Sequence, residues 1–268
     1  MKTGQHTKIS AVIITYNEIG YIERCIASVS FADEIIVVDS YSSDGTYEYL
    51  CAHPKVTVFQ HPFQDFTKQK TFAMKQASND WVLFLDADEV VSYNLGQEIL
   101  ETVQEPLHVA YWFYRKFMFK SSHLRFSGWQ TDKNYRLFQK SKVKFCQDRR
   151  VHECLEIDGS SGILKERLIH RSYKDFEDYK AKMVHYGQLK ALQYHEKGKS
   201  VNALKLMAAP FWKFFYNYTV RLGILDGKKG LIICYLNALS DLERYRYYRL
   251  LAHQNGQLRE ATLRTATD

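Results

Sequence analysis

Three acidic residues follow an apolar run in residues 81–90, WVLFLDADEV. Asp86 and Asp88 are separated by one alanine, and Glu89 comes next. Carboxylates at the end of a buried strand can form a simple turn, because Asp favours strand-to-loop junctions. They can also bind Mg²⁺ or Mn²⁺, hard cations that take oxygen ligands from carboxylates and from substrate phosphates. The position of these acids relative to the predicted strands and helices distinguishes between a turn and a metal site.

The acids end the last of four predicted strands that alternate with predicted helices. Short apolar, β-branched runs predict strands at 9–15, 34–40, 55–61 and 81–86. Helical spacing of apolar residues, or helix-forming composition, predicts helices at 18–30, 45–53, 65–78 and 93–105. This alternation predicts a parallel sheet covered by helices. Further strand-like segments at 110–120, 134–140 and 165–173 make the expected fold α/β, with a mixed, mainly parallel sheet and helices on both faces. In such sheets the ligand binds beyond the carboxyl ends of the strands.

Polar segments stand at those strand ends. They are TYNE at 15–18, DSYSSDGT at 39–46 and DADE at 86–89. Tyr16 could stack on a nucleotide base, and Asp39 could accept hydrogen bonds from a base or a ribose. The alternative for the second segment is a loop in which Asp44 caps the following helix.

The segments AVIITYNE, EIIVVDSYSSDGT and WVLFLDADE, in this order and at these spacings, resemble the family 2 glycosyltransferases of the GT-A fold. QDFTKQKTFAMKQASNDWVLFLDADE, RLFQK, VHE and RLGILDGKKG resemble the bacterial lipopolysaccharide-core subgroup. The resemblance is strong over roughly the first 90 residues and looser to about residue 250. It implies an inverting sugar transfer from a UDP-sugar or another nucleotide sugar, with Mg²⁺ or Mn²⁺ on the diphosphate.

The resemblance implies roles for individual residues. Thr15, Tyr16 and Glu18 would line the nucleotide pocket, Asp39 would contact the uracil or the ribose, Asp86 would face the ribose, and Asp88 would bind the metal. Lys70 is a candidate nucleotide or phosphate contact, with a solvated helix face as the alternative. Arg136 could reach the diphosphate. His170 could be a further metal ligand, with a structural histidine at a strand end as the alternative.

An inverting transfer also needs a general base that takes the proton of the acceptor hydroxyl. The base should lie after the acids, in the half of the domain that binds the acceptor. The candidates are Glu153, in RRVHE, and Asp132, in GWQTDKN. Glu153 is preferred because VHE resembles the subgroup, and its alternative role is a salt bridge to Arg149 or Arg150.

The chain is predicted to consist of a GT-A catalytic domain at 1–174 and a helical C-terminal extension at 175–268. Within the first, 1–105 forms the nucleotide-sugar half and 106–174 the acceptor half. In residues 205–250, aromatic residues alternate with lysines and arginines. This pattern suits a helix in a membrane interface, and it equally suits a packed core or a dimer seam. With a lipid-linked or lipopolysaccharide-core acceptor, we expect peripheral attachment to a membrane; a homodimer remains open.

Composition narrows the function classes. The net charge of +7 suits a nucleic acid, an anionic membrane or a phosphorylated substrate. Five scattered cysteines without a CxxC pair argue against a zinc ribbon and suit reduced cytosolic thiols. With no apolar N-terminal segment, we expect a cytoplasmic enzyme on the inner face of the membrane.

Two other functions compete with glycosyl transfer. A nucleotidyltransferase should carry a Gly-rich phosphate loop near the N-terminus, where only Gly4 and Gly20 occur in the first 20 residues. A nucleic-acid-binding protein should show a recognition motif, and the basic residues here are spread along the chain. We therefore expect no nucleic-acid partner.

Overall fold

The computed structural model describes residues 6–119, 122–146, 155–173, 176–198 and 203–265. The chain forms two compact units. The first unit consists of Met1–Lys116 and Thr131–Arg171, and the second of Phe117–Gln130 and Ser172–Asp268. The second break lies close to the boundary expected at residue 174. The sequence did not indicate that residues 117–130 pack with the C-terminal helices.

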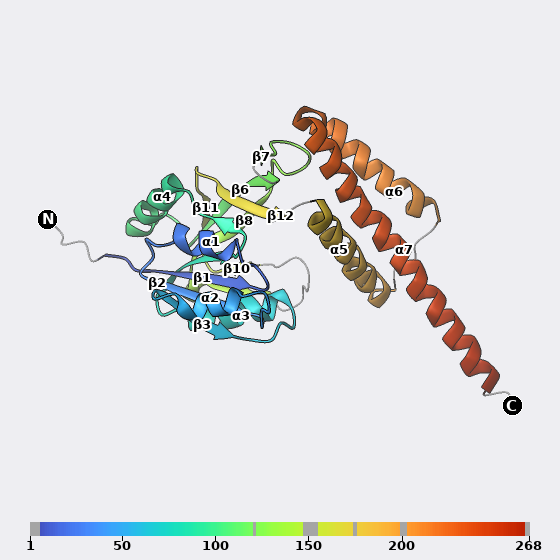
Figure 1. Cartoon of the computed structure of the whole chain (residues 1–268), viewed down its shortest axis with the longest axis horizontal. Coiled ribbons are helices and arrows are strands. Elements are labelled where there is room, and N and C mark those ends of the chain that lie inside the picture. Colours follow the sequence, from blue (N-terminus) through green and yellow to red (C-terminus); the bar gives the residue numbers. More distant parts are fainter. Residues whose placement is uncertain (1–5, 120–121, 147–154, 174–175, 199–202, 266–268) are drawn as a thin grey trace. The chain divides into compact units, whose positions relative to one another are not determined.

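The first unit is built on the predicted parallel strands. They are β1 (Ile9–Thr15), β2 (Glu34–Asp39), β3 (Val56–Gln60) and β4 (Trp81–Asp86), in the order β3-β2-β1-β4. Each neighbouring pair is parallel, which confirms the α/β prediction. The short connections follow the alternation seen in the sequence (Figure 1).

Antiparallel strands extend the sheet beyond β4. The long strand β6 (Ala110–Phe119) pairs with β8 (Lys133–Gln139), which pairs with β4. Next to β6 lie β12 (Leu168–Tyr173) and then β5 (Glu89–Val90). The short strands β7 (Ser122–His123) and β11 (Ser161–Ile163) also pair with β6, while β9 (Val143–Phe145) and β10 (Leu155–Ile157) form a separate pair. The sheet is therefore mixed, as expected.

Alternate residues of β1 face opposite sides of the sheet. Ile9, Ala11 and Ile13 share a core with α1 (Ile22–Ser28), α2 (Thr46–Ala52) and α4 (Tyr93–Gln104). Val12 and Ile14 share the other core with α3 (Phe66–Gln76). All five side chains are buried. Apolar side chains on both faces of one strand explain its continuous apolar sequence and confirm that helices cover both faces.

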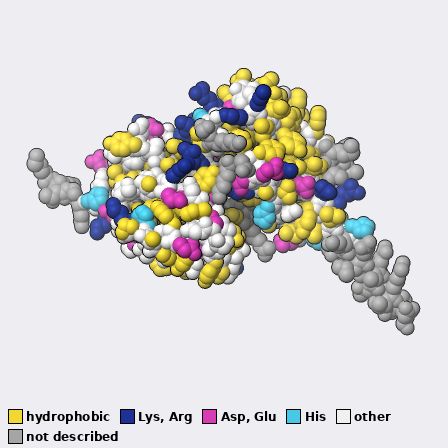
Figure 2. Space-filling model, in the orientation of Figure 1, with side chains coloured by type: hydrophobic (Ala, Val, Ile, Leu, Met, Phe, Trp, Pro, Cys, Tyr) yellow, Lys and Arg dark blue, Asp and Glu magenta, His cyan; other side chains and the backbone are white. Residues whose placement is uncertain are grey.

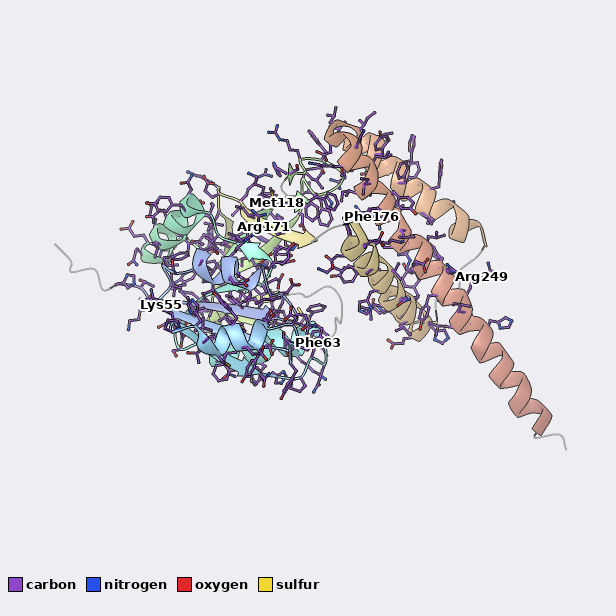
Figure 3. All side chains as sticks on the ribbon, viewed as in Figure 1. Lys55, Phe63, Met118, Arg171, Phe176 and Arg249 are labelled. Atoms are coloured by element: carbon purple, nitrogen blue, oxygen red, sulfur yellow. The ribbon has the colours of Figure 1, made fainter. Side chains whose placement is uncertain are left out.

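The second unit is mainly helical. It contains α5 (Phe176–Glu196), α6 (Ala203–Phe215), a π-helical turn (Tyr216–Val220), a 3₁₀ turn (Gly223–Asp226) and α7 (Gly227–Thr265). Helix α7 packs against both α5 and α6 (Figure 1). Gly187 allows the close approach of α5 to α7, because a Cβ atom there would lie 2.6 Å from the Ser240 carbonyl oxygen. Phe176 begins α5, and Arg249 lies on α7 (Figure 3).

One carboxylate fastens residues 117–130 to these helices. Asp226 accepts hydrogen bonds from the backbone N–H groups of Arg125 and Phe126 and from the Ser127 hydroxyl, at 2.8–3.0 Å. Among the helices of the described ranges, none is both long and apolar enough to cross a membrane.

Candidate active site

The predicted strand-end residues come together because the parallel strands end in register. Thr15 at the end of β1 pairs with Asp39 at the end of β2, and Ile14 pairs with Asp86 at the end of β4. These three strands are neighbours in the sheet. Thr15, Asp39 and Asp86 therefore stand at one edge of the sheet.

Asp39 is buried and held by its own loop. It accepts hydrogen bonds from the Ser42 backbone N–H at 3.0 Å and from the Ser42 hydroxyl at 2.5 Å. Gln60 Nε2 approaches the same carboxylate at 3.4 Å. The Thr15 hydroxyl is also buried, and no hydrogen-bond partner for it occurs among the described residues. Both polar groups lie where a ligand of a parallel sheet is expected.

The loops after β1 and β2 are tied to each other. Asn17, with a left-handed φ of 55°, accepts a hydrogen bond from the Ser43 N–H. Asp44 accepts from the N–H groups of Ile19 and Thr46, so it links the two loops and contacts the first residue of α2. The N-cap position itself is Gly45, one residue after the one that the cap alternative named. Between these links, Tyr16 is 59% exposed and available for stacking.

Glu18 belongs to the same pair of loops. Its backbone N–H donates to the Thr46 hydroxyl at 3.1 Å. Its side chain is half-buried, beside the exposed Tyr16. Thr15, Tyr16 and Glu18 are close in the sequence, and the structure adds that their segment is bonded to the loop that follows Asp39.

Asp86 is surrounded by positive charge. Arg136 Nη2 lies 2.5 Å from Asp86 Oδ2, and Lys70 Nζ lies 3.7 Å from Asp86 Oδ1. Burial alone would raise the pKa of Asp86, but the charges of Arg136, Lys70 and Arg115 together hold it well below its usual range. The carboxylate therefore stays ionised at neutral pH.

The alternative role for Lys70, a solvated helix face, is wrong. Its side chain is only 5% exposed, and Nζ also lies 5.4 Å from the centre of the Phe84 ring. Helix α3 turns this lysine toward the end of β4 instead of toward solvent. A helical residue with polar neighbours in sequence gave no sign of that orientation.

The sequence left Glu89 without a role, and Arg115 was not singled out. Glu89 is completely buried and accepts from Arg136 Nη2 at 2.6 Å and from the Asp86 N–H at 3.1 Å. Arg115, on β6, approaches Glu89 at 3.4 Å and Asp132 at 2.7 Å. A chain of alternating charges thus runs from Asp86 to Asp132. Asp86, Glu89, Arg115 and Arg136 come from four separate strands, and Asp132 directly precedes the strand of Arg136, so spacing along the sequence could not reveal the whole chain of charges.

The two predicted metal ligands lie next to each other. His170 Nε2 is 3.3 Å from Asp88 Oδ2, because β12 pairs with β5 and sets His170 opposite Glu89. The Arg171 N–H also donates to the Asp88 carbonyl oxygen at 2.9 Å. Within the described ranges, no group of three or more His, Cys, Asp or Glu side chains is arranged to hold a metal. Two protein ligands would suit a cation that also takes substrate phosphates.

Of the two candidates for the general base, Asp132 lies within the described residues. Asp132 Oδ2 accepts from Arg115 Nε at 2.8 Å and lies 2.7 Å from Arg115 Nη2. That ion pair occupies one of its oxygens. Glu153 lies outside the described residues, as do Arg149 and Arg150.

Comparison with known sequences identifies relatives of this chain. The sequence model of Glycosyl transferase family 2 matches residues 10–154. A glycosyltransferase of Rickettsia bellii is 30% identical, over 96% of this chain and 92% of its own length. The lipopolysaccharide core biosynthesis glycosyltransferase LpsC of Rhizobium meliloti is 28% identical, over 88% of this chain and 93% of its own length.

The comparison with solved structures supports the fold. The structure of S. aureus TarS 1-349 in complex with UDP aligns with a TM-score of 0.50 at 16% identity, over 93% of this chain and 92% of that chain. The similarity concerns the mixed, mostly parallel sheet with its helices, and this chain also has C-terminal helices. The fold is therefore GT-A, as the sequence resemblance implied.

Proposed function

The chain belongs to glycosyl transferase family 2, and we propose that it moves a sugar from a UDP-sugar to a hydroxyl group of a lipopolysaccharide-core or other cell-envelope glycan, with inversion. The observation that carries the proposal is the alignment of Thr15, Asp39 and Asp86 at one edge of the sheet, with Asp88 and His170 beside them. The name of LpsC supports this acceptor class. The UDP in the TarS structure makes UDP the first nucleotide to test.

In this proposal the nucleotide lies across the ends of β1, β2 and β4. Tyr16 stacks on the base, and Asp39 and Asp86 accept hydrogen bonds from the base or the ribose. Asp39 is already oriented by Ser42, which reduces the entropy lost when a ligand binds. Arg136 and Lys70 supply positive charge at the strand end where a diphosphate would lie.

Asp88 and His170 would hold a divalent cation. The fit rests on a carboxylate oxygen and an imidazole nitrogen 3.3 Å apart, both largely buried. When bound, Mg²⁺ or Mn²⁺ would stabilise negative charge on the leaving diphosphate. Glu153 is the proposed general base for the acceptor hydroxyl, with Asp132 as the second candidate.

Calorimetry with UDP, in the presence and absence of Mn²⁺, tests the nucleotide site. We expect wild-type protein to bind UDP more tightly with Mn²⁺, and Asp88→Asn to lose that metal-dependent gain. Asp158→Asn, an exposed aspartate on a loop, is the matched control. A metal-dependent gain that survives in Asp88→Asn would remove Asp88 as the metal ligand, and no UDP binding under either condition would exclude the UDP site.

A screen of nucleotide sugars, measured as hydrolysis with metal present, would then identify the donor. Glu153→Gln should retain UDP binding and lose transfer, because it removes the proton acceptor but keeps the size of the side chain. Retained transfer in this variant would move the role of base to Asp132.

A further inference from the structure

The helical unit exposes many large apolar side chains on neighbouring elements. Figure 2 shows hydrophobic side chains gathered over this part of the molecule. We call this set the apolar surface: Phe211, Trp212, Phe215, Tyr216, Val220, Leu222, Ile224, Leu225, Leu231 and Tyr235. An exposed patch built from consecutive elements is unusual for a monomer and marks an interaction surface.

The apolar surface is separate from the unit's own core. On α7, Ile233 and Leu236 are fully buried, whereas Leu231 and Tyr235 are about half exposed. One face of helix α7 therefore packs in the core, and another face exposes apolar side chains to solvent. On α6 and the following turn, the ring of Trp212 lies 6.2 Å from that of Phe215 and 6.3 Å from that of Tyr216, which makes the aromatic part continuous.

The turn between α6 and α7 is held in an uncommon conformation. Leu222 has a left-handed φ of 57°, a region that glycine normally occupies, and its side chain is 45% exposed. Close packing of Gly223 and Gly230 fixes the turn, since a Cβ atom on Gly230 would overlap the Gly223 carbonyl oxygen. An exposed leucine in a strained position is a feature that stability alone does not favour.

The charge around the apolar surface is positive. Residues 208–235 contain four basic residues, Lys213, Arg221, Lys228 and Lys229, and one acidic residue, Asp226. Lys213 also lies 3.4 Å from the Asp241 carboxylate, so the excess positive charge comes from Arg221, Lys228 and Lys229. The Asp226 carboxylate is already bonded to the segment Arg125–Ser127. Lys228 and Lys229 are exposed at the start of α7. Trp, Phe and Leu bordered by Lys and Arg are typical of helices that lie in the interface of an anionic membrane.

We propose that the apolar surface docks on an anionic lipid bilayer, with its apolar side chains at the acyl boundary and its basic residues on the headgroups. A second copy of the chain is the competing occupant. A two-fold contact would set the same patch against itself, so the excess positive charge of one copy would face that of the other. An anionic bilayer instead offers the opposite charge. The proposal goes beyond sugar transfer and does not depend on it.

Co-sedimentation with vesicles tests the proposal without any nucleotide sugar. The vesicles contain phosphatidylethanolamine and phosphatidylglycerol at three to one, or phosphatidylcholine alone. We expect wild-type protein to sediment with the anionic vesicles and much less with the neutral ones. The triple variant Phe211→Ser, Trp212→Ser, Leu225→Ser should stay in solution. The control Tyr93→Ser, Leu107→Ser removes two apolar side chains of the sheet unit that are even more exposed, and it should sediment as wild type does.

The electrostatic part has its own variant. Lys228→Gln should lower the partition coefficient on anionic vesicles about fivefold, the usual effect of one basic residue at such a surface. Lys55→Gln, on the sheet unit, should have no effect. Circular dichroism confirms that each variant is folded.

Three results would overturn the proposal, the first two of them in the sedimentation assay. One is wild-type protein that fails to bind anionic vesicles, and another is a folded triple variant that binds them as well as wild type. The third is a wild-type dimer that the triple variant converts to a monomer without vesicle binding by either, which would assign the apolar surface to a subunit interface.

Discussion

Glu89 is expected to be a major contributor to the stability of the sheet unit. Its carboxylate is completely buried and lies 2.6 Å from Arg136 and 3.4 Å from Arg115. Removing one member of a buried ion pair typically costs about 3–5 kcal/mol, because the remaining charge is left uncompensated. In Glu89→Gln, the ion pairs of Arg136 with Asp86 and of Arg115 with Asp132 remain. We therefore expect the lower end of that range, about 3 kcal/mol.

Urea unfolding followed by circular dichroism measures this loss. Glu101→Gln, an exposed residue of α4, is the matched control and should change the free energy of unfolding by less than about 0.5 kcal/mol. A double-mutant cycle with Arg136→Gln then isolates the coupling between the two side chains. A loss below about 1 kcal/mol in Glu89→Gln, with an unchanged m value, would refute the reasoning, because it would mean that the buried contact between Glu89 and Arg136 contributes little beyond the remaining pair of Arg136 with Asp86.

Two further predictions concern other parts of the chain. Gly230→Ala should destabilise the helical unit by about 3 kcal/mol, at the upper end of the range for overpacking, because the added Cβ atom would overlap the backbone. Thermal unfolding checks this, with the nearby substitution Lys228→Ala as the control. The pKa of Asp86 is held below its usual range, so its contribution to stability is fully present above about pH 5 and is lost as the pH falls below about 4. The difference in unfolding free energy between wild type and Asp86→Asn should therefore narrow in acid, and a constant difference from pH 6 to 3 would contradict the assignment.

Local patterns were enough to predict the parallel half of the sheet. The strand predicted at 81–86 matches β4, and the helix predicted at 65–78 contains α3. Asp65 is the N-cap of α3 and accepts a hydrogen bond from the Lys68 N–H. Both elements are defined by periodicity and by residues adjacent in sequence. The gathering of Asp39 and Asp86 at one edge follows from parallel pairing alone.

Contacts between distant strands were not predictable in this way. Arg136 reaches Asp86 because β8 runs antiparallel to β4, in a register that pairs Leu83 with Leu137. Arg115 joins the same charges only because β6 lies on the far side of β8. A single sequence contains neither the order of these strands nor their register. The bonding of Asp226 to residues 125–127 joins segments about 100 residues apart and was equally unpredictable.

The charge balance gives a physical reason for different roles of the two aspartates in DAD. Asp86 already faces two permanent cations, Arg136 at 2.5 Å and Lys70 at 3.7 Å. A divalent cation placed on Asp86 would be repelled by both of them. At an effective dielectric constant of about 20, two unit charges about 4 Å apart repel by about 4 kcal/mol, and a doubly charged ion doubles that figure. Asp88 lies 3.3 Å from His170. Unlike arginine or lysine, an imidazole carries no permanent charge, and it is a common metal ligand. In the proposed function, this difference in charge favours Asp88 over Asp86 as the metal ligand and leaves Asp86, with Arg136 and Lys70, to the nucleotide.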